Sequence, residues 1–376
     1  MNFELTEEQQ LIGQSAREFG KEFLDPIAVD LDHSGKFPKE IIEQLASYDF
    51  LGLLVPESQG GAGAGFVAYI QVVEALSRSC PAVASILNNH AMATHAIATW
   101  GSEAQKAEHV AALAKGSRLG AVAVYENGPA PGIGPDALVA SRQGDSYVLN
   151  GTKAFVRNAG VADVYVVFAT LDSSEKKEQT AFLVDARAGG LTVGPLLDTM
   201  GLKGCPVAHL LFSNVSVPAS ALLGAENGGS AIARTLLAVS SVAEAAQTVA
   251  IGKAAVRHAA EYAQQRIQFK QPIAKLQAIQ TLLAEAATDS QLAWLGVLRA
   301  AQLIENGEPF EADAAMVKAF LARFGSKMLI DCCQVEGGFG FSEFMPLPRL
   351  FRDIAGTTLL DAPADYPDKI IADSIA

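Results

Sequence analysis

The sequence predicts an α+β protein built from three consecutive regions, and two observations carry this prediction. Helical periodicity fills the first third and the last part of the chain, whereas short apolar or alternating runs separated by turn residues fill the middle. Helices, then strands, then helices favour an α+β architecture over alternating βα units. We therefore expect an N-terminal helical domain over 1–118, a middle β domain over 119–225 and a C-terminal helical bundle over 226–376.

The N-terminal region has helix signals from its first residues onward. Thr6 and Gln9 have the spacing of a capping box, which predicts a helix start. Pro38 suits the first turn of a second helix, and a third is expected over about 66–79. The glycine-rich segment 60–65 before it lacks the GxGxxG spacing of a dinucleotide-binding loop. We interpret this segment as a flexible surface loop.

Five short runs predict the strands of the middle region, at 121–125, 147–150, 164–169, 180–184 and 209–212. Their length and the turn residues between them are typical of an antiparallel sheet or a small barrel. Three long segments rich in good helix formers predict the C-terminal bundle, at about 229–266, 274–305 and 311–335.

Composition excludes several classes of partner. The chain has 28 Lys and Arg against 41 Asp and Glu, and this net charge of −13 disfavours nucleic acid and anionic membranes. No signal peptide and no uncharged run of about 18 apolar residues is visible. The four cysteines form no CxxC pair, and the six histidines have no metal-ligand spacing. These observations predict a cytoplasmic protein with reduced thiols and no metal site.

A series of short phrases occurs in a fixed order along nearly the whole chain, from Leu5 to about residue 372. They include 147–153 (YVLNGTK), 158–160 (NAG), 200–204 (MGLKG), 222–224 (LLG), 266–269 (RIQF), 277–280 (QAIQ), 334–340 (QVEGGFG) and 352–353 (RD). In this order and at these spacings the sequence resembles the acyl-CoA dehydrogenase family.

The resemblance implies a fold, a cofactor and a reaction. It implies an N-terminal helical domain, a β-barrel-like middle domain and a C-terminal four-helix bundle. It implies FAD held between subunits of an oligomer, and α,β-dehydrogenation of an acyl thioester. A carboxylate would remove the α proton while the flavin accepts hydride from the β carbon. An electron-transferring flavoprotein would be the redox partner.

Five residues match the groups that such a subunit donates to the adenine side of its neighbour's FAD. By motif these are Arg266, Gln268, Phe269, Gln334 and Gly338. They supply a cation for a diphosphate, an aromatic ring for adenine, two amides and a glycine that allows close backbone approach.

The flavin-facing positions differ from the family pattern. Tyr125 stands where a small hydroxyl residue is usual, and Pro135 stands where a serine is usual. Phe155 stands where a tryptophan is usual and could still cover a flavin ring. Arg157 replaces a serine or threonine, and it would either stabilise anionic reduced flavin or fill the pocket.

The position of the catalytic base has also changed. Asp361 stands where the family usually has glutamate, and Pro363 follows where threonine is usual. Some members place the base on another helix, but both relevant positions are serines in this chain, Ser240 and Ser241. Glu244 lies one helical turn beyond Ser240 and is a second candidate. It would otherwise pair elsewhere or face solvent.

Three functions remain open on the sequence. The first is an acyl-CoA dehydrogenase-type flavoenzyme that acts on an acyl thioester. The second is a non-catalytic or half-site subunit of a hetero-oligomer, because the residues donated to a neighbour are kept while the chain's own site is altered. The third is a flavoenzyme with different chemistry in the same pocket.

Overall fold

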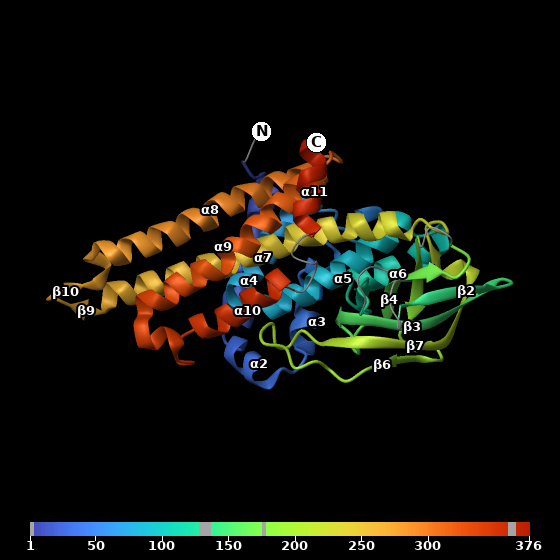
Figure 1. Ribbon diagram of the computed structural model, residues 1–376, viewed down its shortest axis with the longest axis horizontal. Helices are drawn as coiled ribbons and strands as arrows, with labels where there is room; N and C mark the ends of the chain where they lie inside the picture. Colours follow the sequence, from blue (N-terminus) through green and yellow to red (C-terminus); the bar gives the residue numbers. More distant parts are fainter. Residues whose placement is uncertain (1–3, 128–136, 175–177, 360–365) are drawn as a thin grey trace.

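The computed structural model describes residues 4–127, 137–174, 178–359 and 366–376. Three long C-terminal helices run along the long axis of the molecule, the sheet lies toward one end of that axis, and a small hairpin marks the other (Figure 1). The expected three-part architecture is confirmed, with helices first, then the sheet, then the helical bundle.

The described part of the N-terminal region forms six α-helices; the first, third and fourth begin close to the expected positions, and the other three were not predicted. They are α1 (Glu7–Phe19), α2 (Ala28–Ser34), α3 (Lys39–Ser47), α4 (Gly65–Ser79), α5 (Pro81–Trp100) and α6 (Glu103–Ala114). The predicted capping box is present, because the Gln9 amide donates to Thr6 Oγ1 at 3.2 Å and the Thr6 amide donates to Gln9 Oε1 at 3.0 Å. Pro38 lies one position before the first residue of α3.

The glycine-rich loop leads into α4, whose N-terminus is capped by the chain's own carboxylate. Glu305, on a C-terminal helix, accepts a hydrogen bond of 2.7 Å from the Val67 amide. Gly61 packs against Val55, where an added Cβ would lie 2.2 Å from the Val55 carbonyl oxygen. The loop is thus fixed by packing, and a carboxylate occupies the helix end where a phosphate would bind.

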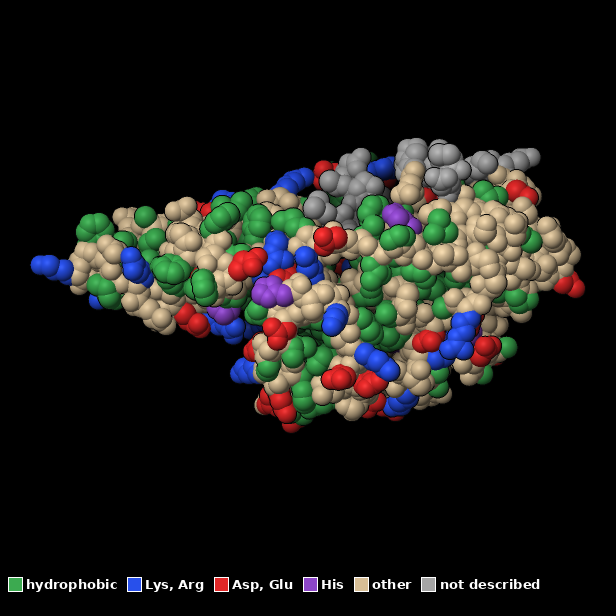
Figure 2. All heavy atoms as spheres, turned by 90° about the horizontal axis from the view of Figure 1, so that it is seen from below, with side chains coloured by type: hydrophobic (Ala, Val, Ile, Leu, Met, Phe, Trp, Pro, Cys, Tyr) green, Lys and Arg blue, Asp and Glu red, His purple; other side chains and the backbone are tan. Residues whose placement is uncertain are grey.

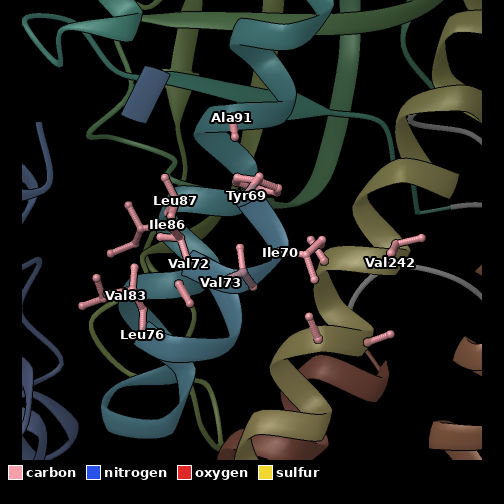
Figure 3. Close-up of a cluster of buried hydrophobic side chains, with 14 of the residues drawn as sticks. Tyr69, Ile70, Val72, Val73, Leu76, Val83, Ile86, Leu87, Ala91 and Val242 are labelled. Atoms are coloured by element: carbon pink, nitrogen blue, oxygen red, sulfur yellow. The ribbon is translucent and has the colours of Figure 1, made fainter. Parts of the chain in front are cut away.

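The core lies where α4, α5 and the first C-terminal helix meet. Both α4 and α5 are buried on nearly all sides, and Figure 3 shows Tyr69 and Ile70 of α4 packed near Ala91 of α5 and Val242 of the C-terminal bundle. Helices without a polar face belong inside a protein. This packing fixes the spacing of α4, α5 and the first C-terminal helix, which border the junction of the sheet and the bundle.

The middle region forms a mixed sheet rather than a purely antiparallel one. Its strands are β1 (Gly120–Ala123), β2 (Val139–Gln143), β3 (Ser146–Arg157), β4 (Val164–Leu171), β5 (Gln179–Asp185), β6 (Leu191–Val193), β7 (Val207–Pro218) and β8 (Leu222–Leu223). The order is β6-β7-β3-β2-β4-β5-β8, with β1 on β4. Both β1 and β2 pair with β4 in parallel, and the other pairs are antiparallel.

The C-terminal region consists of long helices joined at one end by a short hairpin. The elements are α7 (Gly229–Gln265), β9 (Ile267–Gln268), β10 (Gln271–Pro272), α8 (Gln277–Glu305), α9 (Glu311–Glu336), α10 (Leu347–Leu359) and α11 (Tyr366–Ile375). Within the described residues, α7 alone is long and apolar enough to cross a membrane. Because 78% of its most apolar window is buried inside the protein, α7 is a core helix of the bundle.

Candidate functional site

A cluster of three buried charged side chains lies where the sheet meets the bundle. Arg157 at the end of β3 donates from Nη2 to Glu244 Oε1 on α7 at 2.9 Å. Lys318 on α9 donates from Nζ to Glu244 Oε2 at 2.6 Å. Glu244 is only 1% exposed, and both cations are also buried. We call Arg157, Glu244 and Lys318 the charge cluster.

The charge cluster is tied to the end of α10. Lys318 Nζ also donates to the Thr357 carbonyl at 2.9 Å, and the Thr357 hydroxyl lies 2.8 Å from the hydroxyl of Thr248 on α7. Three helices therefore meet around one ammonium group. Asp361, the first candidate base, follows Thr357 by four positions but lies outside the described residues, as do Pro135 and Pro363.

A chain of neutral hydrogen bonds lies near the charge cluster, within the helical core. The Tyr69 hydroxyl on α4 donates to Asn88 Oδ1 on α5 at 2.9 Å, and Asn88 Nδ2 donates to Ser240 Oγ at 3.0 Å. Burial raises the pKa of Tyr69 far above its ordinary range, Arg157 lowers it, and Glu244 raises it further. Tyr69 is therefore a neutral hydrogen-bond donor in this network.

One cleft is lined by three of the residues predicted to face the flavin, Tyr125, Phe155 and Arg157. Asn89 and Ser240 also line this cleft. The register of β3 against β7 shifts between Lys153 and Val156. Such a bulge re-aims side chains, and here Phe155 has a φ of 51° and is 50% exposed. The three predicted flavin-facing residues are thus brought together.

A second buried ion pair holds the segment that carries Tyr125. Lys153 Nζ donates to Glu126 Oε1 at 2.6 Å and to the Val124 carbonyl at 2.9 Å, and the Ala154 amide donates to the Tyr125 carbonyl at 2.8 Å. Burial lowers the pKa of Lys153 to about 8, although Glu126 opposes this shift. These bonds fix the backbone of Tyr125 against β3.

Helix α5 is fixed to the same edge of the sheet through one asparagine. Asn89 Nδ2 donates to the Arg157 carbonyl at 2.7 Å, and Asn89 Oδ1 accepts from the Val122 amide at 3.2 Å. One side chain therefore bridges β1 and β3. This bridge positions the backbone of Arg157 while the charge cluster positions its guanidinium.

The residues expected to serve a neighbour's cofactor lie at the hairpin end of the bundle. Arg266, Gln268 and Gly338 line one open groove, and Gln334 and Gly338 line an adjoining groove. Phe269 is 82% exposed at the tip of the hairpin, with a φ of 51°. Figure 2 shows apolar side chains exposed over this helical end of the molecule.

The structure does not bring the two predicted sets of residues together within one chain. The hairpin β9–β10 lies at one extreme of the long axis, whereas β3, which carries Phe155 and Arg157, lies toward the other (Figure 1). The two predicted sets therefore lie in two separate regions of each chain.

Sequence reasoning missed several residues of the site. Lys318, Tyr69 and Asn88 all lie inside long, mostly apolar helices, and each is more than nine-tenths buried. The sequence signal that could have identified them is a polar residue within an otherwise apolar helical segment. Among the described residues, no group of three or more His, Cys, Asp or Glu side chains could hold a metal ion.

Family models match the chain in three consecutive parts. The N-terminal domain model of acyl-CoA dehydrogenases matches residues 6–117, the middle domain model matches 101–215, and the C-terminal domain model matches 227–376. Together these models account for most of the chain.

Individual proteins match over the full length. An acyl-CoA dehydrogenase of Bacillus subtilis is 35% identical over 370 residues, covering 98% of each chain. The structure of butyryl-CoA dehydrogenase from Megasphaera elsdenii is 32% identical with a TM-score of 0.96 and covers all of both chains. A solved structure named for the electron transferring flavoprotein of Acidaminococcus fermentans is also 32% identical with a TM-score of 0.96, covering 100% of this chain and 99% of that one.

Proposed function

The chain belongs to the acyl-CoA dehydrogenase family, and we propose that it is an FAD-dependent enzyme that dehydrogenates an acyl-CoA thioester between its α and β carbons. The observation that carries the proposal is the full-length fold match combined with one cleft lined by Tyr125, Phe155 and Arg157. The comparisons give no support to the alternative of a non-catalytic subunit.

The residues at both ends of the molecule fit FAD. The half-exposed ring of Phe155 beside the cleft suits the flat flavin ring. At the hairpin end, an added Cβ at Gly337 or Gly338 would meet no atom within 4 Å, so ligand can approach the backbone closely. Arg266 lines the same groove and suits a diphosphate. Bound FAD would supply the hydride acceptor.

We assign removal of the α proton to Asp361, where the proton would rest on a carboxylate oxygen. Glu244, the other candidate, is less suited because both of its oxygens already accept hydrogen bonds from Arg157 and Lys318. Its role is positioning: it holds the guanidinium of Arg157 at the cleft. Lys318 is also a positioning residue, because its ammonium group donates both to Glu244 and to the carbonyl of Thr357, which precedes Asp361 by four positions in the sequence.

Arg157 supplies electrostatic stabilisation in this scheme. Proton removal from the α carbon develops negative charge on the thioester oxygen, and a preorganised cation at the cleft stabilises such charge. The guanidinium is fixed by Glu244, and the backbone carbonyl of Arg157 is fixed by Asn89. Little reorganisation is then needed as the charge develops.

The separation of the two cofactor-binding regions supports an oligomer. A chain that binds the flavin ring near Phe155 would need a second chain to supply Arg266 and Gln268 to the adenine side. We propose a homo-oligomer in which each copy completes a neighbour's site. An electron-transferring flavoprotein is the proposed electron acceptor. The four free cysteines support a location in the cytoplasm.

The test is flavin content followed by reduction with substrate. The protein is purified alone, its FAD per chain is measured, and butyryl-CoA and longer acyl-CoA thioesters are added without oxygen. One FAD per chain and bleaching of the flavin absorbance are expected. Protein that is folded but takes up no FAD would contradict the proposal. Bound FAD that no acyl-CoA reduces would reject dehydrogenation and favour different flavin chemistry.

A further inference from the structure

Glu336 is a buried carboxylate beside the hairpin-end groove, and it has no hydrogen-bond partner among the described residues. It is the last residue of α9 and is 2% exposed. Both of its carboxylate oxygens are buried, and neither accepts a hydrogen bond from the described residues. Sequence reasoning flagged Gln334 and Gly338 on either side of it but not Glu336 itself.

This arrangement is unfavourable for the chain on its own. A buried carboxylate without a hydrogen-bond donor is costly, and such groups in native proteins call for an explanation. The C-terminal end of a helix carries partial negative charge, which adds to the cost. Burial raises the pKa of Glu336 to about 7. Glu336 is therefore a hydrogen-bond acceptor that no described residue of the chain satisfies.

The groove beside Glu336 has the composition of a nucleotide site. It has a volume of about 590 Å³ and is lined by Arg266, Gln268, Glu336 and Gly338, with aromatic side chains at its edge. Ligand pockets are commonly roughly 300–1,000 Å³ in size. A cation suits phosphate, an exposed aromatic ring suits a purine, and an unsatisfied carboxylate suits a ligand that presents O–H or N–H groups.

We propose that Glu336 binds the adenosine part of a neighbouring chain's FAD by accepting hydrogen bonds from its ribose hydroxyls or its exocyclic amine. This inference rests on the proposed FAD-dependent function and adds a residue to it. The ionised carboxylate is the binding form, because it is acceptor-only and makes stronger hydrogen bonds to ligand donors than the protonated acid does.

FAD binding should depend on pH through the titration of Glu336. The other titratable or charged groups that face this groove are Tyr262 and Arg266, and Cys332 and Cys333 lie one turn earlier on α9. Burial raises the pKa of both cysteines, so these thiols stay protonated near neutral pH. Glu336 is then the group that titrates there, and FAD should bind more tightly at pH 8 than at pH 6.

The experiment compares FAD retention by the holoprotein and its variants. Wild type, Glu336→Gln and Glu336→Leu are diluted at pH 6, 7 and 8, and released flavin is followed by its fluorescence. We expect Glu336→Leu to bind FAD about 10-fold more weakly at pH 8, the effect of one charge-assisted hydrogen bond. The FAD affinity of Glu336→Gln should lie between those of wild type and Glu336→Leu. FAD binding by both variants should lose its dependence on pH. Glu308→Gln, an exposed carboxylate between α8 and α9, is the matched control and should behave as wild type.

Two further measurements make the outcomes distinct. FAD whose adenine is replaced by hypoxanthine lacks the exocyclic amine. If this analogue binds wild type more weakly than FAD does, but binds the Glu336 variants as FAD does, the amine is the donor to Glu336. If it binds wild type as tightly as FAD does, the ribose hydroxyls are the donors. Thermal unfolding checks that the near-isosteric Glu336→Gln is folded. A folded Glu336→Gln and Glu336→Leu that retain FAD like wild type at every pH would overturn the inference. Wild type that holds no FAD would instead reject the proposed function.

Discussion

Glu244 and Glu336 are both buried carboxylates of the C-terminal bundle, yet their surroundings are opposite. Glu244 accepts hydrogen bonds from Arg157 and Lys318, whereas Glu336 accepts none from the described residues. Residues of the same chain donate the hydrogen bonds to Glu244, at the junction of the sheet and three helices. The second lies at the end of the bundle that a neighbour would cover. The contrast separates a site that is preorganised within one chain from one that awaits a ligand.

The two carboxylates should also respond differently to mutation. Breaking a buried ion pair leaves an uncompensated charge and costs stability, whereas removing a buried carboxylate that has no partner relieves a cost.

Lys318→Met should destabilise the protein strongly. It removes one of the two cations on Glu244 and the donor to the Thr357 carbonyl. Breaking a buried pair in this way costs about 3–5 kcal/mol of unfolding free energy, measurable by urea denaturation. Lys327→Met is the control, because Lys327 on the same helix pairs with Glu285 and Asp331 at the surface, and it should change stability little. Equal losses in the two variants would contradict a special role for the charge cluster.

Tyr69→Phe should have a smaller effect. It deletes the hydroxyl that donates to Asn88, which in turn donates to Ser240. Leaving a buried acceptor unsatisfied costs about 1–3 kcal/mol. The loss should appear as a lower urea midpoint with an unchanged denaturant slope. An unchanged midpoint would mean that the hydrogen bond from Tyr69 to Asn88 does not stabilise the fold.

Glu336→Gln should change the pH dependence of stability in flavin-free protein. The pKa of this carboxyl is raised from its ordinary value of 4.5 to about 7, so the folded state holds a proton that the unfolded state releases. Stability should therefore fall as pH rises from about 4.5 to about 7 and then level off. Thermal unfolding measured across this pH range should show this decrease in stability in wild type and in Glu308→Gln. The decrease should be smaller in Glu336→Gln. A stability profile that does not differ between wild type and Glu336→Gln would count against a buried, unpartnered carboxyl.

Much of the fold could be predicted because its signals are local. The helix predicted over 311–335 is observed as α9, Glu311–Glu336, since good helix formers and a glycine after the last turn mark it. The start predicted at 274 was three residues early, because Ile273–Lys275 forms a separate short turn before α8. Strands β2, β6 and β8 of the sheet were not predicted, because β2 is mostly polar and β6 and β8 have only three and two residues.

The site was less predictable because its contacts are not local. Arg157 and Glu244 are 87 positions apart, and Lys318 and Glu244 are 74 apart. Periodicity carries no information about such pairs. Glu244 was identified as a candidate only through its helical spacing from Ser240, and its two cationic partners became visible only in three dimensions. The parallel pairing of β1 with β4 is non-local in the same way.

Reduction of the bound flavin by acyl-CoA in wild type and in Asp361→Asn tests the central claim most directly. Both proteins should bind FAD, and butyryl-CoA added without oxygen should bleach the flavin of wild type but reduce that of Asp361→Asn more slowly by about 100-fold or more, the contribution of a positioned general base. Bleaching of Asp361→Asn at the wild-type rate would contradict Asp361 as the proton acceptor and return that role to Glu244 or to another group.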